Sequence, residues 1–282
     1  MLYYYANSGH KIGMERVRRG AALLKKLAAF GVETQLLVND FRAGLLAKEL
    51  GLDAYVTIES ILDIDAIADT GDSIIIDSPE DDKGRLIKYC SDFAHVWRFE
   101  HDSEDSSVYG EKLIRSECKD ETCINALIID DLFFENKPKN NRTLFFLGDA
   151  DYDKMIINNA SFFKAFDMEL LLGNYFFVKY ESDLAKLFDT MHEPEEYTEL
   201  ITSSSCVVTA SSQTALEAKV SGAKVILIQT DKALLYPKHL LEEYGIVVVE
   251  GFDIEKVTHA LDEEVSQSSQ QIEKYDVSNF KI

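Results

Sequence analysis

Short, continuous apolar runs alternate with amphipathic stretches along the whole chain, and this alternation constrains the fold more than any other feature. The run Ser73–Asp77 reads SIIID, and the run Lys224–Gln229 reads KVILIQ. Neither run alternates apolar with polar residues, which is typical of parallel strands covered by helices on both faces. Between such runs, Gly13–Phe30 has apolar residues at the three- and four-residue spacing of a helix. The sequence therefore predicts the α/β class with parallel sheets.

The pattern forms two halves joined by one linker. The segment Glu135–Arg142, ENKPKNNR, holds the only proline between Pro79 and Pro194 and a run of turn-forming residues. We therefore expect one Rossmann-like domain at 1–137 and a second at 138–282. Two such domains leave a cleft between them, and clefts at domain interfaces are favoured ligand sites.

Several elements are assigned from shorter patterns. Expected strands include Asn125–Ile129 and Tyr175–Lys179, and expected helices include Tyr152–Phe166 and Ser182–Met191. The polar tail VSQSSQQIEKYDVSNFKI is either a frayed end or a last helix that docks on the first domain.

The charge balance argues against two classes of partner. The 282-residue chain has 50 acidic and 29 basic residues, a formal net charge of -21. Such a field repels nucleic acid and anionic membrane surfaces, so we expect neither as a partner. The simplest interpretation is an ordinary soluble surface. A protein partner that binds the acidic surface, for example the segment Glu100–Ser107 (EHDSEDSS), is a further possibility, although this segment is most simply a solvated loop.

Cysteine spacing and the lack of targeting signals indicate the compartment. Of the four cysteines only Cys118 and Cys123 are close in sequence, and their spacing is neither that of a zinc knuckle nor that of a redox pair. We expect reduced thiols. No apolar stretch approaches the roughly 20 residues of a membrane helix, and the N-terminus does not resemble a signal peptide. The sequence thus predicts a cytoplasmic protein without membrane insertion.

The first candidate site is the turn between the first strand and the first helix. Backbone N–H groups at a helix start attract anions, and Gly9 and Gly13 allow close approach. Arg16 and Arg19 would add a guanidinium fork for phosphate. A solvent-exposed basic first turn explains the same residues without a ligand, and Glu15 in that turn would compete with an anion.

The second candidate is the turn that follows the apolar run ending at Thr209. Ser211, Ser212 and Thr214 offer hydroxyl and N–H groups to phosphate at a helix start, and Glu217 is placed to bind ribose hydroxyls. The structural alternative is a capping box between Thr214 and Glu217, which needs no ligand.

A third turn, LGDAD, follows the first strand of the second half. Gly148 permits close approach of a phosphate, whereas Asp149 and Asp151 favour a metal or helix capping over bare phosphate.

Histidines offer one candidate general base. None of the six lie at metal-ligand spacing, so we do not expect a zinc site. We assign no metal ligands and expect no cofactor, while acidic turns such as Asp149–Asp151 leave the use of another metal open. His10 lies in the first candidate turn and is a candidate general base, although a loop histidine is more often only solvated.

Four motifs in order carry a family resemblance: IGMERVRRG near the N-terminus, ALIIDDLFF before the linker, then FFLGDAD and ASSQTALEA. Together they resemble the UDP-sugar hydrolase of pseudaminic acid biosynthesis and, more broadly, the two-domain glycosyltransferases with the GT-B fold. The resemblance runs over most of the chain and implies two Rossmann-like domains facing across a cleft, with the acceptor or sugar on the first and the nucleotide on the second.

The residue matches are incomplete. The family's first motif is Ile-Gly-x-Gly-His-x-x-Arg, and Glu15 and Arg16 stand here for its glycine and its catalytic histidine. Gly148 keeps the first glycine of Gly-Gly-x-Asp. Thr214 and Glu217 keep the threonine and glutamate of Gly-x-Thr-x-x-Glu.

The resemblance thus implies a protein that acts on or binds a nucleotide-activated sugar, UDP-linked, in surface glycan or flagellar sugar metabolism. Arginine is no general base near neutral pH, but it neutralises a diphosphate leaving group. Three alternatives stay open: His10 replaces the lost base, the protein transfers rather than hydrolyses, or it only binds. The expected site residues are His10 and Arg16 for catalysis, and Gly9, Gly13, Arg19, Gly148, Ser211, Ser212, Thr214 and Glu217 for the nucleotide and its phosphates.

Overall fold

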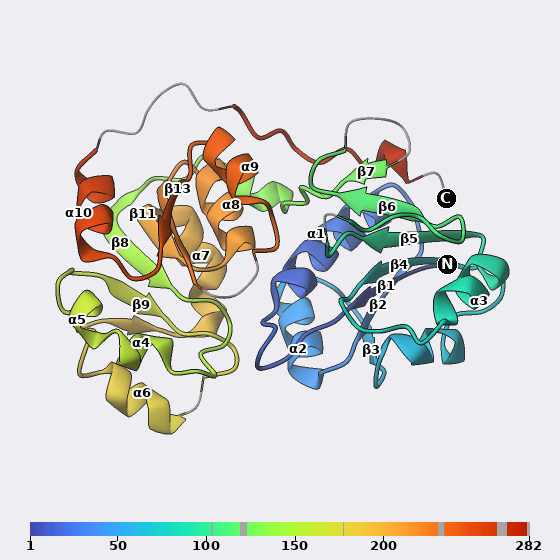
Figure 1. The fold of residues 1–282 in the computed structure, drawn as a ribbon, viewed down its shortest axis with the longest axis horizontal. Coiled ribbons are helices and arrows are strands. Elements are labelled where there is room, and N and C mark those ends of the chain that lie inside the picture. Colours follow the sequence, from blue (N-terminus) through green and yellow to red (C-terminus); the bar gives the residue numbers. More distant parts are fainter. Residues whose placement is uncertain (103, 119–122, 177, 231–233, 264–269, 281–282) are drawn as a thin grey trace. The chain divides into compact units, whose positions relative to one another are not determined.

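The structure is a computed structural model that describes residues 1–102, 104–118, 123–176, 178–230, 234–263 and 270–280 (Figure 1). It divides into two compact units, each with its own sheet. The first unit is Met1–Asp130 together with the tail from Tyr275, and the second is Asp131–Lys274. The division thus falls before the expected linker rather than after residue 137, and the tail rejoins the first unit.

The first unit is a parallel sheet with the order β3-β2-β1-β4-β5-β6-β7. The order reverses between the neighbours β1 and β4, and the carboxyl ends of strands at such a reversal form the usual ligand crevice of open α/β sheets. The strands are β1 (Leu2–Ala6), β2 (Thr34–Val38), β3 (Tyr55–Thr57), β4 (Ser73–Asp77), β5 (His95–Phe99), β6 (Lys112–Arg115) and β7 (Cys123–Asn125). The helices are α1 (Glu15–Ala29), α2 (Phe41–Glu49), α3 (Arg85–Asp92) and the 3-10 turns η1 (Ile61–Ala66) and η4 (Val277–Asn279).

Both faces of this sheet are covered, as the continuous apolar strands predict. Every residue of β1 and of β4 is buried. Tyr3 and Tyr5 pack in one core with Leu86 and Tyr89 of α3. Tyr4 points to the other face, where its ring lies so close to Gly20 of α1 that a Cβ there would be 2.6 Å from Tyr4 Cε1. The glycine therefore lets α1 approach the strand that carries the candidate loop.

The second unit is a parallel sheet with the order β10-β9-β8-β11-β12-β13. Its central neighbours are β8, which the third candidate turn follows, and β11, which the second candidate turn follows. The strands are β8 (Asn140–Phe146), β9 (Glu169–Leu171), β10 (Met191–His192), β11 (Ser204–Thr209), β12 (Lys224–Gln229) and β13 (Val247–Glu250). The helices are α4 (Met155–Asn158), α5 (Ala160–Phe163), α6 (Val178–Leu184), α7 (Tyr197–Ser203), α8 (Ser212–Val220), α9 (Lys238–Glu243), α10 (Ile254–Asp262) and the 3-10 turns η2 (Asp131–Phe134) and η3 (Pro194–Glu196).

Four expected elements differ from the structure. The expected strand Tyr175–Lys179 is wrong, because Val178 and Lys179 belong to α6. The expected helix Tyr152–Phe166 is two short helices, α4 and α5, that meet at Asn159. The helix expected at Ser182–Met191 begins earlier and ends at Leu184, and Met191 lies in β10. β7 ends at Asn125, where the strand Asn125–Ile129 was expected to begin.

The tail follows the second of its two expected forms, although as a 3-10 turn rather than an α-helix. Tyr275 donates a hydrogen bond to the carbonyl oxygen of Asn125 over 2.7 Å, and the ring of Phe280 meets Trp97 edge-on with centroids 5.3 Å apart. Both contacts anchor the tail to the first unit.

The expectation of reduced thiols is wrong for one pair. Cys118 and Cys123 form a disulfide, whereas Cys90 and Cys206 are free thiols.

Candidate functional site

The loop between β1 and α1 closes on itself. The N–H of Gly13 donates to the carbonyl oxygen of Gly9 over 2.8 Å, and the N–H of Ile12 donates to the same oxygen over 3.0 Å. Gly9 and Gly13 both have positive φ, 154° and 81°, which only glycine adopts readily. These glycines therefore close a tight turn, and the N–H groups of Ile12 and Gly13 point at Gly9 rather than at a ligand. His10 lies within this turn and is partly exposed.

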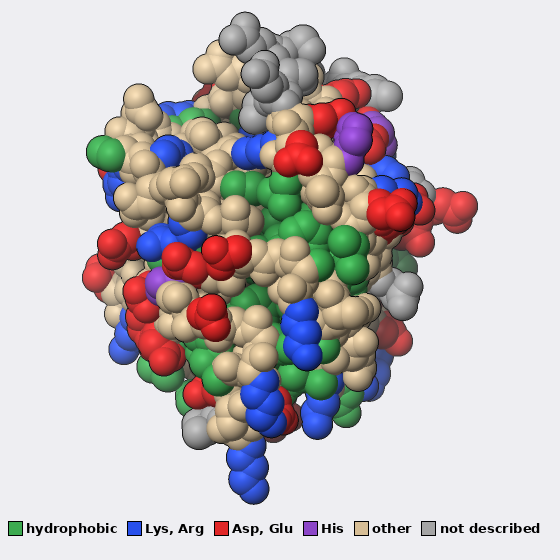
Figure 2. Space-filling model, turned by 90° about the vertical axis from the view of Figure 1, so that its left-hand side faces the viewer, with side chains coloured by type: hydrophobic (Ala, Val, Ile, Leu, Met, Phe, Trp, Pro, Cys, Tyr) green, Lys and Arg blue, Asp and Glu red, His purple; other side chains and the backbone are tan. Residues whose placement is uncertain are grey.

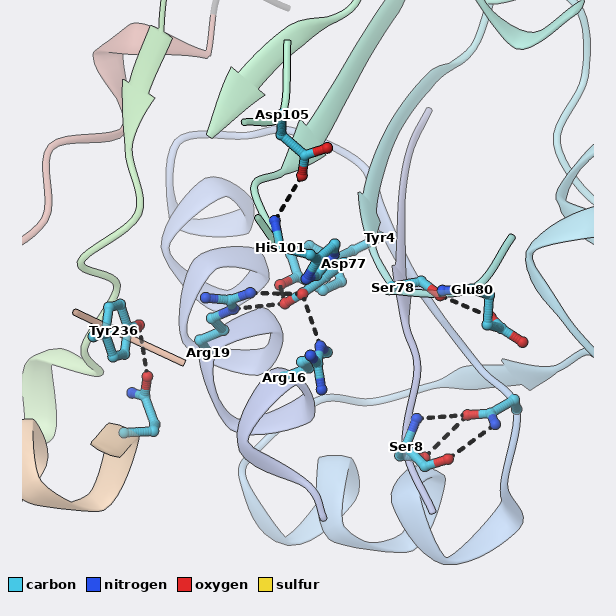
Figure 3. Close-up of polar contacts among 12 residues, drawn as sticks. Tyr4, Ser8, Arg16, Arg19, Asp77, Ser78, Glu80, His101, Asp105 and Tyr236 are labelled. Carbon is cyan, nitrogen blue, oxygen red and sulfur yellow. Dashed lines mark hydrogen bonds and ion pairs between the residues drawn. The ribbon is translucent and has the colours of Figure 1, made fainter. Parts of the chain in front are cut away.

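The loop is held to the neighbouring strand end by one amide. The Ser8 N–H donates to Asn39 Oδ1 over 2.8 Å, and Asn39 Nδ2 donates back to the Ser8 carbonyl oxygen over 2.9 Å (Figure 3). Asn7, just before, is buried, and its Oδ1 has no hydrogen-bond partner among the described residues. The carboxyl end of β1 is thus a rigid, polar edge.

A buried cluster of opposite charges lies beside this loop (Figure 3). Asp77, the last residue of β4, is fully buried, and Arg19 binds it with both Nε and Nη2 over 2.6 Å each. The Tyr4 hydroxyl donates to the same carboxylate over 2.6 Å. The guanidinium of Arg19 also stacks on Phe99, 3.7 Å from the ring centroid. The guanidinium fork predicted for phosphate therefore holds Asp77, which fixes α1 to β4.

Arg16 lies one turn earlier on α1 and is held more loosely. Its Nε is 3.3 Å from Asp77 Oδ1, and 15% of its side chain is exposed. Within the described part of the chain, no residue accepts a hydrogen bond from its two terminal nitrogens. Asp77 thus has one negative charge, whereas Arg16 and Arg19 together have two positive charges. The surplus positive charge lies on Arg16, on the side of the guanidinium that makes no hydrogen bond to the described residues.

The described residues of the acidic segment after β5 form an exposed loop, as expected, and ion pairs and hydrogen bonds hold part of it. Asp105 accepts the N–H of His101 over 2.8 Å and pairs with Arg98 Nη1 over 3.2 Å. Arg115 binds the Asp105 carbonyl oxygen and lies 3.6 Å from Glu100. These contacts fix His101 beside Asp77, as Figure 3 shows.

The charges in the cluster shift two pKa values downward. Burial alone would raise the pKa of Asp77, but the charge and hydrogen bonds of Arg19 and the charge of Arg16 hold it below its ordinary value. Burial, together with the charges of Arg16 and Arg19, lowers the pKa of His101 from 6.5 to about 4, although Asp77 opposes this shift. At neutral pH the imidazole is neutral, so it adds no charge to the cluster.

In the second unit, the start of α8 is buried in an internal hydrogen-bond network. Ser211 is the N-cap, because its Oγ accepts the N–H of Thr214 over 3.1 Å. The Tyr197 hydroxyl lies 2.8 Å from Thr214 Oγ1 and donates to Glu217 Oε2 over 2.5 Å, while Gln213 donates to Glu217 Oε1 over 2.9 Å. The expected capping box between Thr214 and Glu217 is therefore wrong. Thr214 is the third residue of α8 and not its N-cap, and the Glu217 carboxylate accepts hydrogen bonds from the side chains of Tyr197 and Gln213.

All four residues that were expected to bind the nucleotide at the start of α8 are buried. Ser211, Ser212, Thr214 and Glu217 are at most 4% exposed. The Ser212 Oγ accepts the N–H of Leu235 over 3.1 Å, which places the segment after β12 over the helix start. The side chains expected to bind phosphate and ribose thus have protein partners here.

The LGDAD turn uses its second aspartate as a cap. Asp151 accepts the N–H groups of Met155 over 2.6 Å and Ile156 over 3.2 Å, and Tyr180 also donates to it. This confirms helix capping, one of the two roles expected for Asp151. Asp149 accepts the amide of Asn174 over 2.9 Å. Gly148 has a positive φ of 128° and stays partly exposed.

The structure brings together part of the expected set and adds residues to it. Arg16, Arg19 and the His10 loop lie at one sheet edge, and Gly148 lies with the α8 residues at the edge of the other sheet. Tyr4, Asp77 and His101 were missed. The position of Asp77 and His101 in the sequence could have identified them. Both lie at or just after the carboxyl end of a buried apolar strand, where parallel sheets place their ligand-binding residues.

The described residues contain no group of three or more histidine, cysteine, aspartate or glutamate side chains arranged to hold a metal ion. None of their helices combines the length and apolarity needed to span a bilayer.

Figure 2 shows acidic side chains on both sides of a band of hydrophobic side chains, with lysine and arginine among them, on one face of the molecule.

Comparisons with known proteins identify the fold. No protein-family model and no curated protein sequence matches the chain. Among solved structures, the UDP-GlcNAc 2-epimerase of Methanocaldococcus jannaschii matches with a TM-score of 0.56 and 13% identity, over 95% of this chain and 94% of that one. The Neisseria meningitidis UDP-GlcNAc 2-epimerase bound to UDP-GlcNAc matches with a TM-score of 0.52 and 10% identity, over 93% of this chain and 92% of that one. At such identities the likeness shows the fold alone: two Rossmann-like α/β domains of the GT-B type.

Proposed function

We propose that the protein binds a nucleotide-activated sugar, UDP-linked, and acts on it as a GT-B-type hydrolase or glycosyltransferase. The observation that carries this proposal is the surplus positive charge of Arg16, which lies where strand order reverses in the first sheet. A guanidinium whose two terminal nitrogens make no hydrogen bond to the described residues is suited to bidentate binding of a phosphate. The Neisseria structure of the same fold contains UDP-GlcNAc, which supports the ligand class.

The proposed chemistry assigns one role to each residue. Arg16, anchored through Nε by Asp77, neutralises the diphosphate as it leaves the anomeric carbon. His10 takes the proton of the attacking water or sugar hydroxyl. Gly148 and the α8 start lie on the nucleotide side, and a nucleotide there competes with the Leu235 contact to Ser212. The resemblance to the hydrolase of pseudaminic acid biosynthesis favours surface glycan or flagellar sugar metabolism.

Calorimetric titration tests the binding step. We expect UDP-GlcNAc and UDP to bind and to raise the melting temperature, because a ligand specific for the native state stabilises it. Arg16→Gln should weaken binding about tenfold or more, since hydrogen bonds to charged groups contribute about 1.5–3 kcal/mol.

The matched control is Arg85→Gln, which removes an arginine of α3 that pairs with Asp65. It should leave the affinity unchanged. Absence of binding by any uridine or adenine nucleotide or nucleotide sugar at millimolar concentration would contradict the proposal, as would equal effects of the two arginine variants.

A second candidate function is binding without catalysis. It is favoured by Arg16, which stands where the family motif has its histidine. Release of free UDP from UDP-GlcNAc and related UDP-sugars, with and without acceptor sugars, separates the two. We expect release by the wild type and its loss in His10→Gln with binding retained. Binding of UDP-sugars with no release from any of them would instead establish the non-catalytic function.

A further inference from the structure

A pocket lies in the first unit, at the amino ends of β5 and β6. It has a volume of about 340 Å³, within the range of about 300–1,000 Å³ that small-molecule sites occupy. Because all strands of this sheet are parallel, these ends lie at the edge opposite the one that carries Asp77 and Arg16. The residues that line it include Cys90, Phe93, His95, Trp97, Lys112 and Asn279.

Rigid aromatic groups form one side of this pocket. Trp97 is 3% exposed and lies in the middle of β5, and its indole is braced by Phe280 of the tail. The imidazole of His95, two residues earlier on the same face of the strand, lies 5.3 Å from Trp97 between ring centroids, at an interplanar angle of 32°. Phe93 adds a buried ring at the end of α3. Such a wall favours a planar, apolar ring.

One uncompensated positive charge faces the same space. Lys112 lies directly opposite Trp97 in the register of β5 and β6. Within the described residues, neither Lys112 nor His95 has a hydrogen-bond or ion-pair partner for its side chain, and none of the described residues that line the pocket is acidic.

The carboxylate next to Lys112 in sequence is bound by other groups. Glu111 is 2% exposed, and it accepts the N–H groups of Val108 over 3.0 Å and Tyr109 over 2.9 Å. It also lies 3.6 Å from Arg98 Nη2. Burial and the charge of Glu111 raise the pKa of the Cys90 thiol to about 11, so this pocket residue is neutral at physiological pH.

We propose that this pocket binds a small aromatic carboxylate, with its ring against Trp97 and its carboxylate at Lys112. An aromatic wall and an ammonium that has no partner among the described residues suit a planar ring with a single anionic group. The site is separate from the proposed nucleotide-sugar site and does not depend on it.

Trp97 gives a direct measurement, because it is the only tryptophan of the chain. Anthranilate is the probe, since it has the ring and the carboxylate and accepts excitation energy from tryptophan. We expect saturable quenching of the Trp97 emission in the full-length protein. Anthranilamide, which has the same shape without the charge, should bind about fivefold more weakly or worse.

Two lysine variants test the charge. Lys112→Gln should weaken anthranilate binding by about fivefold or more, and Lys112→Arg should restore most of the affinity. Lys88→Gln is the control, because this α3 lysine pairs with Asp65 and Asp92 and does not line the pocket. It should leave the affinity unchanged, and circular dichroism checks that each variant is folded.

Three results would overturn the proposal: no saturable quenching up to about 10 mM anthranilate, at which even a millimolar site is filled; equal affinity for anthranilamide; or an unaltered affinity in folded Lys112→Gln. Displacement of anthranilate by UDP-GlcNAc would refute a separate site. None of these results bears on the nucleotide-sugar test with Arg16→Gln.

Discussion

Arg16 and Arg19 lie one helical turn apart on α1, but the tertiary structure gives them different roles. Arg19 is enclosed by Asp77, Tyr4 and Phe99, so its charge is used within the protein. Arg16 shares the same carboxylate at a longer distance and keeps its terminal nitrogens for another partner. The sequence showed a basic first turn; which arginine is structural depended on β4, which lies far away along the chain.

His101 should make the first unit sensitive to acid. Its pKa is about 4 in the folded protein against 6.5 ordinarily. Between these pH values the unfolded chain binds a proton that the folded chain does not, so stability falls as the pH falls from 6.5 towards 4. The full loss is about 3 kcal/mol. Urea unfolding followed by Trp97 fluorescence should show this slope, because Trp97 lies in the same unit.

His101→Gln removes the titrating group and should flatten the slope in that window. His259→Gln, which changes an exposed histidine of α10 in the other unit, is the control and should leave the slope as it is. An equal slope in wild type and His101→Gln would show that other groups cause the acid sensitivity.

At the scale of elements, strands that are apolar throughout were predicted well and short helices poorly. β1, β4, β11 and β12 are central, buried strands, and burial on both faces requires the apolar runs by which they were recognised. α4 and α5 have four residues each, too few for a full amphipathic period. Tyr175 and Phe176 have the composition of a strand but lie outside any strand, because tertiary packing overrides such a preference, while Phe177 lies outside the described residues.

One turn between elements depends on close backbone contact. A Cβ at Gly173 would lie 2.5 Å from the Gly148 carbonyl oxygen and 2.6 Å from the Asp149 carbonyl carbon. Gly173→Ala should therefore destabilise the second unit by about 1–3 kcal/mol, because backbone atoms must move apart.

Scanning calorimetry together with Trp97 fluorescence measures this effect. The calorimetric transition of the second unit should shift to lower temperature, while the transition reported by Trp97 stays in place. An unchanged calorimetric profile would show that the turn accommodates the methyl group.

At the scale of the whole molecule, the first unit is completed by residues from the far end of the chain. Phe280 is 6% exposed and packs on Trp97, although the whole second unit separates the two in sequence. Phe280→Ala should lower the stability of the first unit by about 3–5 kcal/mol, the usual effect of removing a buried phenylalanine ring.

The matched control is Phe30→Ala, because Phe30 is 73% exposed in the same unit. It should change the stability little. Urea midpoints from Trp97 fluorescence compare the two variants, and equal midpoints would mean that the tail contributes nothing to the stability of the first unit.

Periodicity and glycine placement alone determined the α/β class, the two halves and the turns that follow β1, β8 and β11, because these features arise from local hydrophobic patterns. Only the tertiary structure decided that Asp77 holds Arg19, that Tyr197 and Gln213 engage Glu217, and that the tail returns to Trp97. These contacts join residues on different elements, and their geometry depends on strand order and side-chain burial, which no local pattern encodes. The surplus charge of Arg16 is a consequence of that geometry.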